Sequence, residues 1–215
     1  MVMNIINVDE ENFVVDNKQI NIKTKNNKLT LKCYNKNLIV LDNYLKELDI
    51  ILYDNSVVNL YINSNKLNIN SVINIYVKNN TTFNLLSGFK INKNSNIQII
   101  NNIEGNNNQS NIKIRGISSK ELLNIDVELK VPEKTKDNIL VEDIKGITDG
   151  GKVIIKPVME IDTNEVIANH FVTIGNIDKN MLFYLTSKGI NYENAKKLIL
   201  NGFLESVKLG GEKNE

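Results

Sequence analysis

The sequence predicts an all-β fold that ends in a pair of α-helices. Three observations support this prediction. Apolar and polar residues alternate over most of residues 2–161, asparagine-rich turn clusters separate the alternating runs, and no long helical period lies between them. Alternation with period two is typical of strands that bury one face. The lack of helices between the strands excludes a doubly wound α/β fold.

The strand pattern is clearest where Leu123, Ile125, Val127 and Leu129 alternate with polar residues. Shorter runs of the same kind occur at residues 58–62, 73–77, 97–99 and 112–114. The segment Asn43–Tyr53 fits a helical spacing of leucines as well as a strand, so the sequence leaves it unassigned.

The turns favour wide corners over tight hairpins. Clusters such as Asn79–Thr81 and Asn92–Asn94 are rich in asparagine, which tolerates the left-handed conformation. The two-residue Asp-Gly or Asn-Gly hairpin signal occurs once before the C-terminal helices, at Asp149-Gly150. However, no repeat of fixed length is visible. The pattern alone therefore leaves a parallel β-helix, a barrel, and a sandwich or jelly roll open.

Two helices are predicted after Gly175. Asp178 is suited to cap the first helix, and Gly189 is suited to stop it with Lys188 in its last turn. Asn191 is suited to cap the second helix, and apolar residues then recur at helical spacing from Ala195 onward.

Composition excludes several function classes. The chain has 215 residues, 41% of them hydrophobic, and a formal net charge of +1, which does not suggest a nucleic-acid binder. No apolar run is long enough to cross a membrane, and no signal segment opens the chain, so we expect a cytoplasmic protein. The stretch Gly146–Lys152 lacks the spacing of a phosphate loop, so we expect no nucleotide to be bound by this chain.

The residues available for chemistry are few. The chain has one cysteine, Cys33, and one histidine, His170. A single cysteine excludes an internal disulfide and a site with several thiolates from this chain. Cys33 fits a small core residue. Acidic residues Glu160, Asp162 and Glu165 fit a solvated face, or a carboxylate pair of the kind that cleaves polysaccharides. The chain has no tryptophan to stack on sugars, which argues against that enzyme class.

Four segments in the last third of the chain carry a further signal: Lys156–Ile161, Ala168–Asp178, Leu182–Ile190 and Ala195–Phe203. Together they resemble the SufB/SufD family of SUF iron–sulfur cluster assembly scaffolds, and Ala168–Asp178 is similar to a SufD-type histidine motif. These segments keep both their order and their spacing. The match is good over residues 150–207 and loose upstream.

The resemblance implies a right-handed parallel β-helix over residues 1–177, a helical segment over 178–209 and a charged tail over 210–215. It implies a non-enzymatic scaffold that docks a SufC-like ATPase through the C-terminal helices. It also implies pairing with a SufB-like paralogue, or with a second copy as a homodimer, through the β-helix. The alternative is a structural or carbohydrate-active β-solenoid without a role in cluster assembly.

The resemblance also implies functional residues. The SufD-type histidine falls on His170, which becomes a candidate ligand of a transient iron–sulfur cluster at a subunit interface. Phe183, Tyr184, Gly189 and Phe203 become candidates for the ATPase interface, or for anchoring the helices on the β-body.

The chain departs from the family pattern in several ways. We expect it to be a short form of the family, without the N-terminal helical region of typical members. Phe171 replaces the usual glycine after the histidine, and Lys188 replaces an arginine. No cysteine stands at the SufB-type position before the proline.

Overall fold

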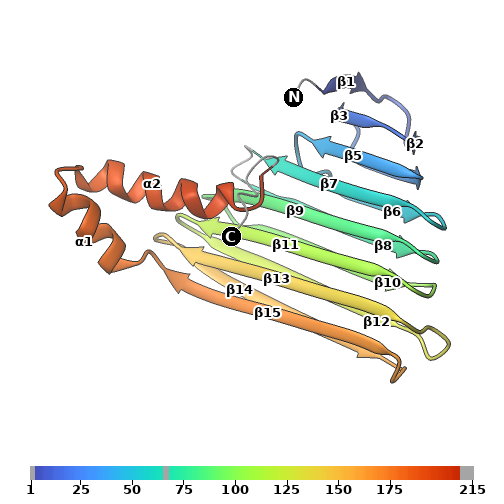
Figure 1. The fold of residues 1–215 in the computed structure, drawn as a ribbon. Coiled ribbons are helices and arrows are strands. Elements are labelled where there is room, and N and C mark those ends of the chain that lie inside the picture. Colours follow the sequence, from blue (N-terminus) through green and yellow to red (C-terminus); the bar gives the residue numbers. More distant parts are fainter. Residues whose placement is uncertain (1–2, 65–67, 209–215) are drawn as a thin grey trace.

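The structure, a computed structural model, describes residues 3–64 and 68–208 as a β-helix with two C-terminal helices (Figure 1). The predicted charged tail, residues 210–215, lies outside the described residues. Strands that follow each other in the chain alternate between two sheets, and every pairing within a sheet is parallel. The parallel β-helix is therefore confirmed, and the antiparallel sandwich is excluded.

One sheet contains the eight odd-numbered strands, in chain order. They are β1 (Asn4–Asn7), β3 (Gln19–Lys23), β5 (Lys36–Leu41), β7 (Val57–Ser64), β9 (Thr82–Ile91), β11 (Gln109–Ser118), β13 (Asn138–Thr148) and β15 (Val166–Asn176).

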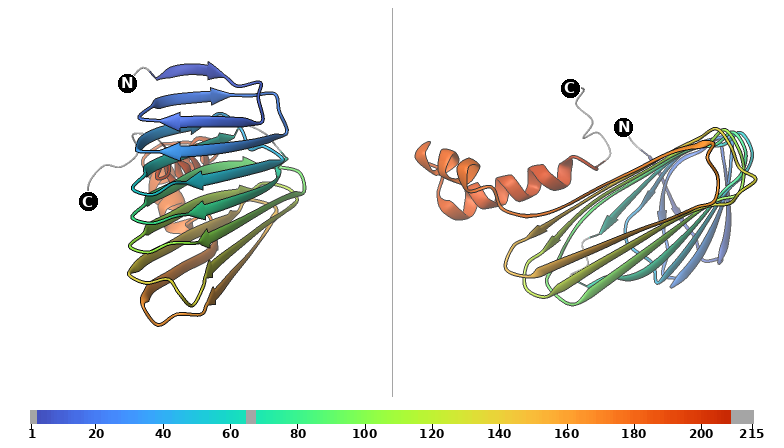
Figure 2. Two further views of the ribbon diagram at one scale, coloured as in Figure 1. Left: turned by 90° about the vertical axis from the view of Figure 1, so that its right-hand side faces the viewer. Right: turned by 90° about the horizontal axis from the view of Figure 1, so that it is seen from below.

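The other sheet contains the seven even-numbered strands. They are β2 (Asn12–Asp16), β4 (Lys28–Tyr34), β6 (Glu47–Leu52), β8 (Asn70–Val77), β10 (Ser95–Ile103), β12 (Leu122–Val131) and β14 (Lys152–Ile161). The ambiguous segment Asn43–Tyr53 thus holds a strand, β6. The coils widen toward the C-terminus, from four residues in β1 to eleven in β15 (Figure 2).

The core lies between the two sheets and is filled by one phase of each alternation. Leu123, Ile125, Val127 and Leu129 of β12 are at most 1% exposed, which confirms the predicted inward face. Burying such apolar side chains contributes about 1.5–3 kcal/mol each, before conformational entropy is subtracted. The repeated inward rows make the two sheets one continuous core.

Asparagine shapes the corners in two ways. Five asparagines at the corners adopt positive φ angles between +48° and +64°: Asn17, Asn35, Asn55, Asn80 and Asn107. Asp137 also has a positive φ angle, at the equivalent corner of a later coil. Buried asparagines also form hydrogen bonds between successive coils. Asn108 Oδ1 accepts a hydrogen bond from the Thr81 amide at 2.9 Å, and Asn138 Oδ1 accepts one from the Asn108 amide at 3.0 Å. These contacts satisfy backbone groups that would otherwise be buried without partners.

The helices α1 (Lys179–Ser187) and α2 (Tyr192–Glu205) follow β15. The predicted caps are confirmed: Asp178 accepts from the Asn180 and Met181 amides, and Asn191 accepts from the Asn194 amide. Gly189 has φ +87°, as a helix stop requires.

Helix α2 packs on the outer face of β9 and β11, while α1 projects away from the body (Figure 2). Ala195 and Leu200 of α2 are buried, and so is Val207 just after the helix. Gly88 of β9 permits the close approach, since a Cβ atom there would lie 2.9 Å from Val207 Cγ2. No helix within residues 3–64 and 68–208 is long and apolar enough to cross a membrane.

Candidate functional site

His170 lies on β15, the last strand of its sheet, and is exposed. Val166 and Ala168 of the same strand pack against the core. With period two, His170 belongs to the same inward phase. The histidine is exposed although it faces inward because no further coil follows β15 in the described chain.

A straight inward row leads through the sheet to His170. The row begins with apolar residues on three neighbouring strands. Leu60 of β7 pairs in register with Leu85 of β9, and Leu85 pairs with Ile112 of β11. Ile112 then pairs with Glu142 of β13, and Glu142 pairs with His170. The row therefore ends in two polar, ionisable residues at the open end of the β-helix.

Glu142 is an unusual core residue. It is 1% exposed, and neither of its carboxylate oxygens has a hydrogen-bond partner among the described residues. Burial raises the pKa of the Glu142 carboxyl to about 7. A buried charge without a partner is costly, so this carboxyl requires a proton or a cation nearby.

Cys33 is far from this site in the fold. It lies on β4 near the N-terminal end of the stack and is fully buried in the core. Desolvation raises the pKa of its thiol to about 12, so the thiolate is scarce at neutral pH. Cys33 therefore supplies no ligand beside His170. Across residues 3–64 and 68–208, no three histidine, cysteine, aspartate or glutamate residues gather as a metal site.

The outer face of the last strands carries exposed apolar residues. Ile167 is 59% exposed and Phe171 is 56% exposed, both on the face of β15 opposite to His170. Ile139 of β13, the register partner of Ile167, is also exposed. The bulk of Phe171 therefore does not cover the histidine.

The acidic stretch before the histidine forms no built site. Glu160, Asp162 and Glu165 are all exposed to solvent. The Glu160 carboxylate makes only a 3.9 Å ion pair with Lys130. These features fit the solvated face that the sequence suggested.

The open end of the β-helix also presents two strand edges. β14 pairs only with β12, and β15 pairs only with β13, within the part of the chain that the structure describes. Figure 1 shows these two strands at the end of the stack opposite to β1, with β15 continuing into α1. Their outward-pointing backbone groups are free to pair with another chain.

Of the four candidate residues in the helical segment, three are exposed and one is partly buried. Phe183 is 75% exposed and Tyr184 is 58% exposed, and α1 as a whole contributes no buried residue. Phe203 of α2 is partly buried. Gly189 is exposed and serves the turn between the helices.

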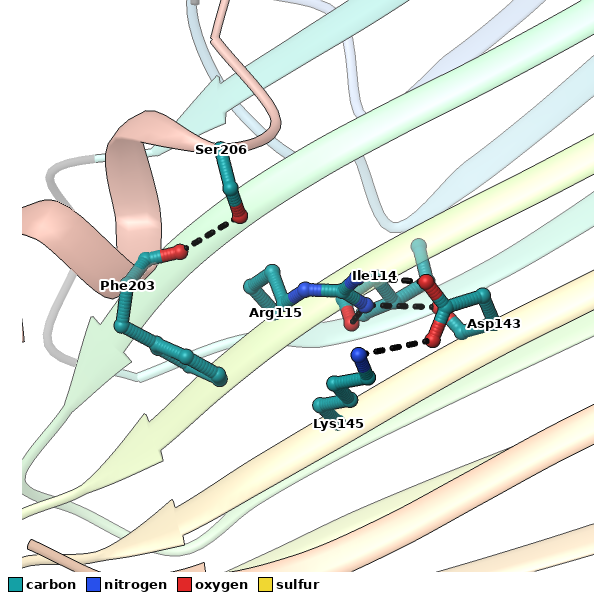
Figure 3. A network of polar contacts seen from close by, with 6 residues as sticks. All are labelled: Ile114, Arg115, Asp143, Lys145, Phe203 and Ser206. Atoms are coloured by element: carbon teal, nitrogen blue, oxygen red, sulfur yellow. Dashed lines mark hydrogen bonds and ion pairs between the residues drawn. The ribbon is translucent and has the colours of Figure 1, made fainter. Parts of the chain in front are cut away.

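A buried ion pair lies beneath α2. The Arg115 guanidinium, 5% exposed, pairs with the Asp143 carboxylate at 2.5 Å and donates to the Asp143 carbonyl at 2.9 Å. Lys145 adds a 3.8 Å ion pair to the same carboxylate. Figure 3 shows this network on β11 and β13, with Phe203 of α2 and the C-cap residue Ser206 on the adjoining side.

A second ion pair fixes α2 to the body. The Asp149 carboxylate pairs with Lys196 of α2 at 2.6 Å and with Lys90 of β9 at 3.1 Å. Burial alone would raise the pKa of Asp149, but hydrogen bonds and charge from Lys196 and Lys90 outweigh burial and lower it. The loop after β13 thereby holds the helix.

Glu142 was not singled out from the sequence, although a signal exists. Glu142 alternates in phase with the apolar residues Leu140 and Ile144, which suggests an inward side chain. However, Ile139 and Val141 are apolar as well and point to the opposite face, so the sequence alone does not show which face of this strand is buried. Asp149 and Gly88 were missed because their roles depend on the docking of a distant helix.

Comparison with known proteins assigns this region to a described family. Residues 92–203 match the family model described as "SUF system FeS cluster assembly, SufBD core domain". The match includes β10 to β15 and both helices in large part. It also includes every candidate site residue predicted from the sequence except Cys33.

Curated relatives show the same similarity over shorter segments. The chain is 41% identical to the iron-sulfur cluster assembly protein SufD of Bacillus subtilis over 51 residues, which are 24% of this chain and 12% of that protein. It is 37% identical to a SufBD family protein of Mycobacterium leprae over 62 residues, 28% of this chain and 16% of that protein. It is 34% identical to SufD of Escherichia coli over 71 residues, 33% of this chain and 15% of that protein. The matched segments thus span less than a fifth of each of these relatives.

Proposed function

Because the chain belongs to the SufBD family of the SUF iron–sulfur cluster assembly system, we propose that it is a non-enzymatic scaffold subunit of such a system. In this proposal, it works in the cytoplasm, docks an ABC-type, SufC-like ATPase, and pairs with a second scaffold chain. The chain binds no nucleotide itself, and the ATPase supplies nucleotide chemistry. The observation that carries the docking proposal is that α1 contains no buried residue and exposes Phe183 and Tyr184 to solvent.

The ATPase would dock on the exposed face of α1. Phe183 and Tyr184 are large aromatic residues on a helix that buries none of its own side chains. Aromatic anchors of this kind dominate the binding energy of many interfaces. Phe203 is assigned the other role, anchoring α2 on the β-body, because it is partly buried beside β11.

The experiment for docking measures binding of the cognate ATPase by calorimetry. The double variant Phe183→Ala, Tyr184→Ala should weaken binding about tenfold or more, since each anchor contributes on the order of 1–2 kcal/mol. Val14→Ala, an exposed apolar residue on β2, is the matched control and should bind like wild type. Equal affinity of the double variant and wild type would refute this docking surface.

The second scaffold chain would pair with the open end of the β-helix. The free edges of β14 and β15 offer backbone groups for an intermolecular sheet, and the adjacent exposed residues Ile167 and Phe171 offer apolar area. Light scattering after gel filtration tests this proposal, alone and with any SufB-like paralogue. Ile167→Lys should reduce the paired fraction, whereas Ile5→Lys, equally 59% exposed on β1 at the other end, should not.

A transient cluster would then form where the two chains meet, with His170 as one ligand. The imidazole is exposed at the open end, which fits a ligand shared between chains. This chain brings no thiolate there, so partner thiolates or sulfide would complete the cluster. Anaerobic reconstitution of the assembled complex tests the role. His170→Ala should lose iron and visible absorption, and unchanged values in an intact complex would reduce His170 to a structural residue.

A further inference from the structure

We propose that Glu142 and His170 together bind a ferrous ion, and that the open end of the β-helix is where iron enters the scaffold. This inference rests on the proposed function, because it names the form in which iron reaches the His170 site. It adds Glu142 as a ligand and specifies a single divalent ion in place of a finished cluster.

The Glu142 side chain is buried without a partner. Its carboxylate is 1% exposed, in a row that is otherwise apolar at Leu60, Leu85 and Ile112. Neither oxygen has a hydrogen-bond partner in the described chain. Buried polar groups in proteins are nearly always paired, so an orphaned carboxylate requires an explanation. A bound cation supplies both the missing ligand and the opposite charge.

His170 lies directly beside Glu142 in the sheet. Glu142 and His170 are register partners on adjacent parallel strands and share the inward face. Neighbouring strands lie about 4.8 Å apart, and a metal ion sits about 2.0–2.2 Å from each oxygen or nitrogen ligand. The two side chains can therefore reach one ion between their strands. His170 is exposed, which gives that ion a path from solvent.

The two side chains offer oxygen and nitrogen donors. One carboxylate oxygen and one imidazole nitrogen suit a divalent first-row ion such as Fe²⁺, whereas clusters are held mainly by thiolates. The single cysteine, Cys33, is buried on β4 and does not contribute. No third protein ligand gathers with this pair among the residues described. Water, or groups of a second chain across the strand edge, would fill the remaining positions.

Cobalt(II) is the probe for this site, because its visible absorption reports ligand number and type. The full chain is titrated with Co²⁺, followed by competition with Fe²⁺ under anaerobic conditions. Wild type should bind one Co²⁺ per chain, and Fe²⁺ should displace it. Glu142→Gln and His170→Ala should each weaken binding about tenfold or more. Glu160→Gln, an exposed carboxylate on β14, should bind like wild type. Circular dichroism verifies that every variant is folded.

Either of two outcomes overturns the inference. One is that wild type binds no stoichiometric Co²⁺. The other is that either single variant binds as tightly as wild type, which would leave a one-ligand contact. The titration needs neither the ATPase nor a paralogue. Metal binding without ATPase binding would therefore contradict the docking proposal alone, and ATPase binding without metal binding would contradict the iron site alone.

Discussion

Lys196 on α2 and Asp149 after β13 form an ion pair with a distance of 2.6 Å between Nζ and Oδ1. The Asp149 side chain is only 6% exposed, and Lys90 of β9 contacts its second oxygen at 3.1 Å. The pair therefore joins the helical segment to two parts of the β-helix. We therefore expect the Asp149 ion pairs to stabilise the position of α2, and of α1 that precedes it, on the β-helix.

Removal of the Asp149 carboxylate should loosen α2. Asp149→Ala leaves Lys196 and Lys90 facing each other without their common counter-charge, and we expect a loss of about 1–3 kcal/mol in unfolding free energy. Hydrogen exchange of the α2 amides should become faster while β12 amides stay protected. Asp42→Ala is the control: its pair with Lys23 is exposed and 3.8 Å long, so it should change stability by less than about 1 kcal/mol. Unchanged exchange in Asp149→Ala would contradict this role.

The glycine beneath α2 offers a second prediction. In Gly88→Ala, the new Cβ would lie 2.9 Å from Val207 Cγ2 and 3.1 Å from the Leu204 carbonyl. The C-terminal part of α2 must shift, at a cost of about 1–3 kcal/mol. Gly202→Ala is the control, because nothing lies within 4 Å of its Cβ and alanine favours a helix by about 1 kcal/mol. Thermal unfolding should show a lower midpoint for the first variant and an equal or higher midpoint for the second.

Glu142 should make stability fall as pH rises. Its pKa is raised by burial from 4.5 to about 7 in the folded chain, so the folded state holds a proton that the unfolded state has lost. The full stability is present below about pH 4.5 and declines until about pH 7, by on the order of 3 kcal/mol. In Glu142→Gln, urea unfolding with chelator present should lose this decline. Glu160→Gln should keep the decline. An identical decline in both variants would show that the buried Glu142 carboxyl is not its cause.

Local features of the fold could be predicted from the sequence because they depend on neighbours in the chain. The caps Asp178 and Asn191, the helix stop Gly189, and the inward face of Leu123–Leu129 are of this kind. The asparagine corners follow from the same local chemistry. The segment Asn43–Tyr53 remained ambiguous because strand pairing with β4 and β8 decided it.

Features that depend on stacking order could not be predicted from the sequence. Glu142 and His170 are 28 residues apart, and only the register of β13 against β15 makes them neighbours. Asp149 likewise meets Lys196 only after α2 docks. The resemblance identified His170, but the buried carboxylate beside it became visible only in the folded chain.

The most direct measurement for the scaffold proposal is co-purification from the native host. The tagged full chain would be isolated under anaerobic conditions, and its partners identified by mass spectrometry against a tag-only control. We expect an ABC-type ATPase to be enriched in near-stoichiometric amount, and we expect Phe183→Ala, Tyr184→Ala to reduce this enrichment while Val14→Ala does not. Recovery of the folded chain with no ATPase above the control would contradict the scaffold proposal.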